Sequence, residues 1–241
     1  MNTSISKNPK QIINKLKELG DAEKASHSQG FFKTGKAEYG EGDRFLGIRV
    51  PVIRKCAKEH FEISLDDTLN VLASPFHEAR LLALMILVKK YSIEKTAGGK
   101  NLIYRSYLKN TKYINNWDLV DLSAEHIVGA HLFSRDRKQL YRLARSKDLW
   151  ERRISVISTF HFIRKGDFAD TIKIAGLLLD DRHDLIHKAV GWMLREVGKR
   201  HLKTEEDFLK IHYRAMPRTM LRYAIERFPE TKRKRYLKGT I

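Results

Sequence analysis

The sequence predicts an all-α fold, an α-α superhelix (solenoid) made of helical repeats. Apolar residues recur three and four positions apart along most of the chain, as in Ile12, Leu16 and Leu19, and this is the period of an amphipathic helix. We find no convincing run in which apolar and polar residues alternate as they do in a strand. A short helical pattern also returns at related intervals. Successive helices with an internal repeat are typical of a solenoid.

The elements can be placed in order. Ile12 and Leu19 belong to a first helix, and the glycine-containing segment 30–47 is an irregular loop that either gates access to a ligand or simply connects helices. Pro51, Pro75 and Pro217 each stand where a helix could begin. At 241 residues the chain can bury a sizeable core. We expect one repeat domain over 1–241, with a helical cap and loop at 1–45, the array at 46–228 and a basic tail at 229–241.

Charge is the strongest feature of the composition. The chain has 47 Lys and Arg against 29 Asp and Glu, a formal net charge of +18, which indicates either a polyanionic partner such as nucleic acid or a generally basic surface. Cys56 is the one cysteine, so neither an internal disulfide nor a cysteine zinc cluster can form. The polar residues 1–11 do not form a signal peptide, and no stretch approaches the length of a membrane span. We expect a cytoplasmic protein, associated with the nucleoid when bound to DNA.

The internal repeat is carried by four segments with a basic residue before a common apolar pattern: EARLLAL (78–84), ERRISVI (151–157), IHKAVGW (186–192) and MLRYAIE (220–226). Their basic residues are Arg80, Arg153, Lys188 and Arg222, separated by 73, 35 and 34 positions. The first interval is about twice the later ones, so a missing member should lie near 116–118. In a solenoid these positions line the concave side, where we expect a basic DNA-binding face. Taken singly, each of these basic residues could also be an ordinary solvent-exposed residue at the beginning of a helix.

The missing member coincides with the motif NNWDLVD at 115–121. In a helix, Trp117 and Asp121 share a face, with Asp118 one turn from Asp121. The motif also fits a helix start, because Asn116 is a suitable N-cap and Asp118 complements the helix dipole. An acid where a basic residue is expected favours a chemical role for Asp121, although Asp121 could instead pair with an arginine of a neighbouring repeat.

WDLVD (117–121), LWERR (149–153), KAVGWMLRE (188–196) and FLGIRVP (45–51) together resemble the AlkD-like DNA alkylation repair proteins. The likeness runs from about Phe45 to Arg227 in the same order. For active members it implies a DNA glycosylase of HEAT-like repeats that removes cationic N3- and N7-alkylated purines without flipping the base into a deep pocket. The family's two active-site tryptophans fall on Trp117 and Trp192, its essential aspartate on Asp121, and its DNA-contacting arginine on Arg153.

The chemistry is consistent with these residues. A cationic purine leaves as a neutral base and needs little acid catalysis, so the charge to stabilise is the positive charge that grows on the sugar. Asp121 supplies an anion, and the faces of Trp117 and Trp192 favour a cation by roughly 0.5 to 2 kcal/mol each. Periodicity alone would place Trp192 in the core. Trp150 is expected to be structural.

The expected partner is double-stranded DNA with alkylated bases, bound by a monomer without a cofactor. Phosphate contacts are assigned to Arg153 and Lys188, and also to Arg80, Arg152 and Arg222. His183 and His187 are four residues apart, but no third metal ligand is evident, so no metal site is expected. The alternatives are a noncatalytic binder of branched or damaged DNA and a protein scaffold.

Overall fold

A computed structural model describes residues 8–241, and within this range the chain forms helices and no strand. Arg44 and Phe76 form an isolated β-bridge. The predicted all-α class is therefore confirmed. The chain divides into two compact units, one ending at Ser123 and one running from Ala124 to Ile241. The expectation of one continuous repeat domain stays a prediction, and residues 1–7 of its cap lie outside the described residues.

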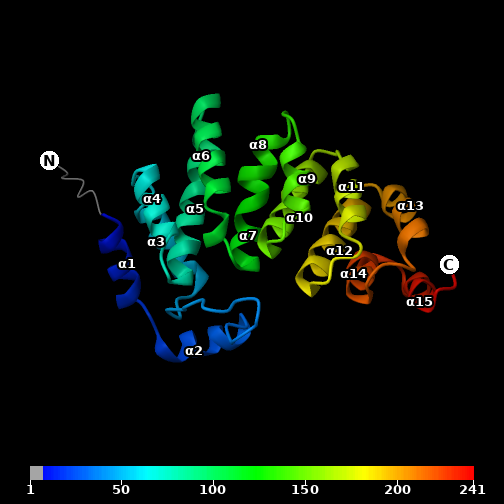
Figure 1. Cartoon of the computed structure of the whole chain (residues 1–241), viewed down its shortest axis with the longest axis horizontal. Helices are drawn as coiled ribbons and strands as arrows, with labels where there is room; N and C mark the ends of the chain where they lie inside the picture. The colour runs from blue at the N-terminus through cyan, green and yellow to red at the C-terminus, as the bar shows by residue number, and fades with distance from the viewer. Residues whose placement is uncertain (1–7) are drawn as a thin grey trace. The chain divides into compact units, whose positions relative to one another are not determined.

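The first unit is organised around one long helix, α5 (His77–Ile93). Its sequence is apolar almost all round, and α3, α4 and α6 pack against it (Figure 1). A helix that is apolar on every side is normally a buried one. The other elements of this unit are α1 (Pro9–Glu18), α2 (Ala22–Phe31), α3 (Val50–Glu59), α4 (Leu65–Leu72), α6 (Ala97–Lys109), η1 (Thr111–Tyr113) and most of α7 (Trp117–Ala124).

The second unit stacks alternate helices against one another. The π-helix η2 (Glu125–Gly129) packs on α10 (Leu149–Arg164), α10 on α12 (Asp184–Gly198), and α12 on α14 (Arg218–Ala224). The intervening helices α9 (Lys138–Ala144) and α11 (Ala169–Leu177) pack on α10, and α13 (Leu202–His212) packs on α12. Within this unit, each helix pair covers the apolar side of the next pair. The unit also contains α8 (Ala130–Leu132), η3 (Ile225–Arg227) and α15 (Glu230–Lys238).

The four repeat segments lie in α5, α10, α12 and α14 with η3, and α7 begins at Trp117, where the repeat predicts a fifth member. The prolines are less uniform than expected. Pro51 lies in the first turn of α3, whereas Pro217 is the N-cap of α14 and Pro75 precedes the N-cap of α5. No helix within residues 8–241 combines the length and apolarity needed to cross a membrane.

Glycine permits the close approach of α12 to α14. A Cβ added at Gly191 would overlap with the carbonyl oxygen of Met220 and lie 2.5 Å from Cβ of Tyr223. Gly129 of η2 approaches α10 in the same way, because its added Cβ would overlap with the Ser158 carbonyl. The stacked helices of the second unit therefore meet at positions where a side chain has no room.

Gly191→Ala is expected to destabilise the protein by about 1–3 kcal/mol, since the methyl group must push α12 and α14 apart. The matched control is Gly176→Ala in α11, where an added Cβ meets no atom within 4 Å and alanine should favour the helix. Urea denaturation measures both. Equal midpoints for the two variants would show that the close approach carries no energetic weight.

Candidate functional site

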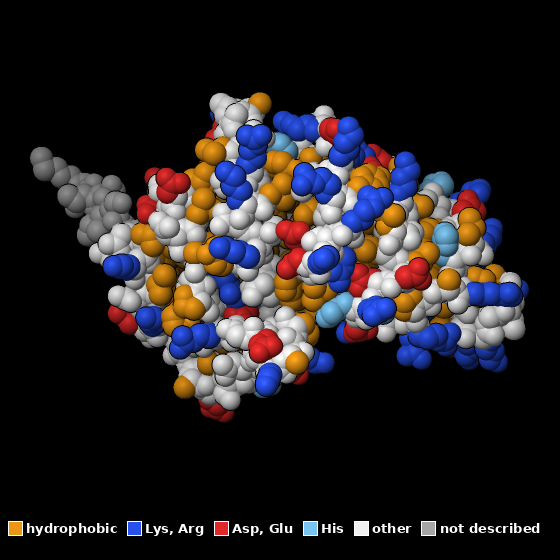
Figure 2. All heavy atoms as spheres, viewed as in Figure 1, with side chains coloured by type: hydrophobic (Ala, Val, Ile, Leu, Met, Phe, Trp, Pro, Cys, Tyr) orange, Lys and Arg blue, Asp and Glu red, His pale blue; other side chains and the backbone are white. Residues whose placement is uncertain are grey.

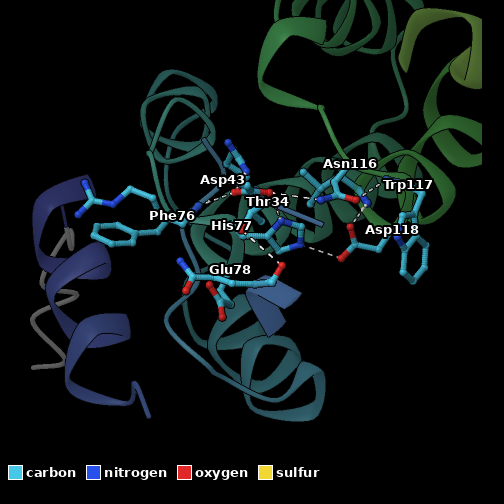
Figure 3. A network of polar contacts seen from close by, with 12 residues as sticks. Thr34, Asp43, Phe76, His77, Glu78, Asn116, Trp117 and Asp118 are labelled. Atoms are coloured by element: carbon cyan, nitrogen blue, oxygen red, sulfur yellow. Dashed lines mark hydrogen bonds and ion pairs between the residues drawn. The ribbon is translucent and has the colours of Figure 1, made fainter. Parts of the chain in front are cut away.

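A buried histidine joins three separate segments of the first unit. His77, the first residue of α5, is 2% exposed. Its Nδ1 lies 2.8 Å from Asp43 Oδ2, in the loop after α2, and its Nε2 lies 2.8 Å from Asp118 Oδ2 in α7 (Figure 3). Arg80, one turn along α5, also pairs with Asp43, and Asn116 Nδ2 donates to Asp43 Oδ2 at 3.4 Å. The loop, α5 and α7 are thus fastened together at one point.

The charges of this cluster balance. Burial disfavours a charged imidazole, but Asp118 and Asp43 outweigh burial and raise the pKa of His77 to about 9. Burial likewise opposes ionisation of Asp43, and His77 and Arg80 outweigh it and hold the pKa of this carboxyl below its usual range. Near neutral pH, two cations therefore face two carboxylates inside the unit.

Aromatic rings connect this cluster to Trp117. The Phe45 ring stacks on His77 with centroids 4.4 Å apart, Phe32 stacks on Phe45 at 4.9 Å, and Trp117 stacks on Phe32 at 5.2 Å. Phe31 meets the indole edge-on at 6.2 Å and is 61% exposed. The indole of Trp117 is therefore supported from behind by a stack of rings that ends on the buried histidine.

The loop that supplies Asp43, Phe32 and Phe45 is held by a second carboxylate. Glu78 accepts hydrogen bonds from the backbone amides of Leu46 at 2.9 Å, Gly47 at 2.7 Å and Ile48 at 3.2 Å. Gly47 has φ of 78°, and an added Cβ would overlap with the Asp21 carbonyl and lie 2.5 Å from the Ala25 amide nitrogen. Only glycine satisfies both demands, so segment 46–48 is fixed against α2 and α5.

The motif at 115–121 forms the beginning of α7. Trp117 and Asp121 are both half-buried, and their four-residue spacing places them on one face of the helix. Asn116 Oδ1 accepts a hydrogen bond from the adjacent Trp117 amide at 2.9 Å. Asp118 lies in the first turn, as expected for a helix start. Asp118 has a further role that the sequence does not indicate, because its carboxylate binds His77.

Trp192 lies in α12 of the second unit. Its side chain is half-buried rather than part of the core, and it meets the Phe160 ring edge-on at 5.8 Å. Phe160 lies in turn beneath the guanidinium of Arg164, 4.5 Å from its centroid. Trp150 is buried, as expected for a structural residue.

The five predicted DNA-binding side chains differ in accessibility. Arg80 is 6% exposed and its charge is matched by Asp43. Arg153 is 5% exposed and donates to the Leu185 carbonyl at 2.5 Å. Three residues are more accessible: Arg152, bound to Asp181; Lys188, whose ammonium lies 2.6 Å from Asp184; and Arg222, which is exposed. On the face shown in Figure 2, Lys and Arg side chains are scattered over each unit among acidic ones.

The two histidines at 183 and 187 serve local structure. His183 Nδ1 accepts a hydrogen bond from the Leu185 amide, and His187 Nε2 binds the Asp181 carbonyl at 2.5 Å. In the described part of the chain, no group of three or more His, Cys, Asp or Glu side chains could hold a metal ion.

The cluster around His77 is not evident from the sequence. Asp43 and Asp118 are 34 and 41 residues from His77, and one member lies in an irregular loop, so neither a helical period nor a short motif connects them. The sequence feature that could have indicated this cluster is the presence of three phenylalanines, Phe31, Phe32 and Phe45, near the ends of the loop.

Comparison with known proteins identifies the family. The model of the DNA alkylation repair enzyme family matches residues 12–228. The chain belongs to this family. The match runs from within α1 to the end of η3. It therefore includes Trp117 and Asp121 in the first unit and Arg153 and Trp192 in the second. The expected family likeness is confirmed. No curated protein compared with the chain matches it.

A solved structure shares the fold of this DNA alkylation repair family member. It is described as a predicted DNA alkylation repair enzyme from Enterococcus faecalis, and its TM-score is 0.67 at 15% sequence identity. The alignment covers 88% of this chain and 98% of that one.

Proposed function

We propose that this protein is a DNA glycosylase that hydrolyses the N-glycosidic bond of cationic N3- or N7-alkylated purines in duplex DNA. One observation carries the proposal. In a member of a DNA alkylation repair family, α7 presents the Asp121 carboxylate and the Trp117 indole on one face, both partly accessible, and the indole is supported by stacked rings.

The proposed reaction needs an anion more than an acid. As the bond between C1′ and the base nitrogen breaks, its electron pair neutralises the cationic base, which leaves, and positive charge develops on the sugar. Asp121 stabilises this charge and orients the water whose oxygen bonds to C1′, and the water's proton passes to solvent. Neither a metal ion nor a cofactor is required for this step.

The two tryptophans are assigned to the cationic base and sugar. The electron-rich face of an indole attracts a cation by roughly 0.5 to 2 kcal/mol, more where water is excluded. The stack of Phe32, Phe45 and His77 behind Trp117 supports this role, since the ring is held before DNA arrives. Trp192 receives the same role by family likeness, supported by its half-buried position.

Phosphate contacts are assigned to the accessible members of the predicted basic stripe, which are Arg152, Lys188 and Arg222. Arg80 and Arg153 are instead proposed to act through their buried partners, the loop carboxylate of Asp43 and the start of α12. The superhelix predicted by the repeat remains part of the proposal, and the stacking of α10, α12 and α14 supports it within the second unit.

Arg222→Ala is expected to weaken binding to duplex DNA equally on all sequences and to reduce the slope of log affinity against log salt by about 1, because one phosphate contact is lost. Lys173→Ala in α11 is the control, since Lys173 is exposed but lies outside the predicted stripe. Fluorescence anisotropy at several salt concentrations measures both. A slope for Arg222→Ala that equals the wild-type slope would remove Arg222 from the interface.

The proposed function is tested by incubating the protein with a duplex that carries one N7-methylguanine and detecting the free base by mass spectrometry. Release of the base, leaving an abasic site, supports the glycosylase. Tight binding to the duplex without release would reject it and favour the noncatalytic DNA binder. Failure to bind DNA would reject both the glycosylase and the noncatalytic DNA binder, and would leave a protein scaffold as the remaining function.

A further inference from the structure

The first unit has an apolar groove that the proposed DNA chemistry does not use. The groove has a volume of about 550 Å³ and lies over α4, α5 and α6. Phe61, Leu65 and Ile103 contribute to its lining, together with Ile93 and Leu102, which are 48% and 57% exposed. Two large aliphatic side chains thus remain in contact with water beside an apolar groove, which is typical of an interaction site.

The groove also contains a partly buried lysine that forms no ion pair with another described residue. The Lys90 ammonium lies 5.2 Å from the centroid of the Phe61 ring, and burial lowers the pKa of Lys90 despite the opposing effect of Glu62. Among residues 8–241, no carboxylate forms an ion pair with Lys90. A partly desolvated ammonium that lacks an ion pair favours an anionic ligand group beside it.

The acidic residue in the groove lining, Glu94, forms hydrogen bonds within its own segment. Glu94 Oε1 accepts hydrogen bonds from the Thr96 backbone amide at 2.7 Å and from its hydroxyl at 2.8 Å, at the beginning of α6. Gly99 leaves room for the Glu94 carboxylate, since an added Cβ would overlap with it. Lys95 joins Lys90 in the lining. The lining therefore carries two lysines against one carboxylate, and that carboxylate is held by local hydrogen bonds.

We propose that this groove docks an acidic amphipathic helix of a partner protein. The apolar lining receives aliphatic or aromatic side chains spaced three and four residues apart, and a neighbouring Asp or Glu pairs with Lys90. The groove is too exposed to enclose a small ligand, because such sites bury most of the ligand surface. A phosphate backbone would gain nothing from Phe61, Ile93 and Leu102, so the apolar lining favours a peptide over DNA.

The test is a selection of displayed, helix-forming 15-residue peptides of random sequence on the full chain, with removal of peptides that bind Leu102→Asp. We expect the recovered peptides to combine an apolar stripe with Asp or Glu. By anisotropy, Lys90→Glu should weaken their binding at least about tenfold, as loss of a charge-paired contact does, while Lys90→Arg retains it. Lys109→Glu, at the far end of α6 and outside the groove lining, is the matched control.

Two results would overturn the proposal. The first is that no peptide is recovered, or that those recovered bind Lys90→Glu and Leu102→Asp as tightly as the wild type. The second is that unmodified duplex DNA displaces the peptides competitively, which would make the groove part of the DNA interface. Circular dichroism melting of each variant accompanies the binding data. Since Leu102 is largely exposed, Leu102→Asp is expected to fold.

Discussion

Asp121→Asn is expected to reduce release of N7-methylguanine under single-turnover conditions by on the order of 100-fold or more, while binding to duplex DNA is retained. Asparagine keeps the size of the side chain but removes the negative charge that the proposed mechanism places beside the developing sugar cation. Rates are measured by rapid quenching with enzyme in excess, and affinity by anisotropy on the same duplex.

Asp118→Asn is the matched control for Asp121→Asn. Both carboxylates lie in α7, but that of Asp118 binds His77 inside the unit. Asp118→Asn should therefore lower stability while leaving the chemical step largely intact at temperatures where the variant is folded. If Asp121→Asn retains the wild-type rate, or if Asp118→Asn loses it to the same degree, the role assigned to Asp121 is contradicted.

Asp43→Ala is expected to destabilise the protein by about 3–5 kcal/mol, since removing one member of a buried charge cluster leaves its partners uncompensated. Here the partners are His77, 2% exposed, and Arg80, 6% exposed. Guanidinium chloride denaturation measures the loss. Leu102→Ala, which removes a largely exposed side chain of the same unit, is the control and should change stability little.

The same cluster gives stability a dependence on pH. His77 has a folded pKa of about 9 against 6.5 when unfolded, so its contribution, about 3 kcal/mol, is fully present below pH 6.5. It is lost as the pH rises through 9. Asp43 acts in the opposite direction, because its pKa is lowered: its contribution is present above the unfolded pKa and is lost as the pH falls through the folded one.

His77→Gln isolates the effect of His77. As the pH rises from 6.5 to 9, the free energy of unfolding of the wild type should fall. The free energy of unfolding of His77→Gln should be lower at pH 6.5 and should fall less over the same range. NMR titration of the histidine Cε1–H signals provides a second measurement. A His77 signal that titrates at its unperturbed pKa, or equal slopes for the two proteins, would show that the paired imidazolium does not stabilise the fold.

The sequence predicted the helical class because the period of apolar residues is a local signal. The start of α7 at Trp117 was also predictable, since Asn116 and Asp118 are residues typical of a helix start. The family likeness depended on short segments such as 117–121, whose residues are close in sequence. Features of this kind depend on neighbours along the chain and are therefore visible without a structure.

Long-range contacts were not predictable in this way. His77, Asp43 and Asp118 meet only because the loop after α2 returns to α5, as fixed by Glu78 and the left-handed Gly47. Arg80 shows what a repeat pattern does not indicate, which is how deeply each of its positions is buried. Its register matches that of Arg222, but the first part of α5 is buried, so the same repeat position is buried in one helix and exposed in another.

The most direct measurement compares two leaving groups in duplexes of the same sequence. One duplex carries N7-methylguanine, which is cationic, and the other carries hypoxanthine, which is neutral. Wild-type protein is incubated with each, and the free base is quantified over time. A mechanism that relies on Asp121 without a general acid predicts release of N7-methylguanine and no detectable release of hypoxanthine. Release of both bases at similar rates, or of neither, would contradict the account.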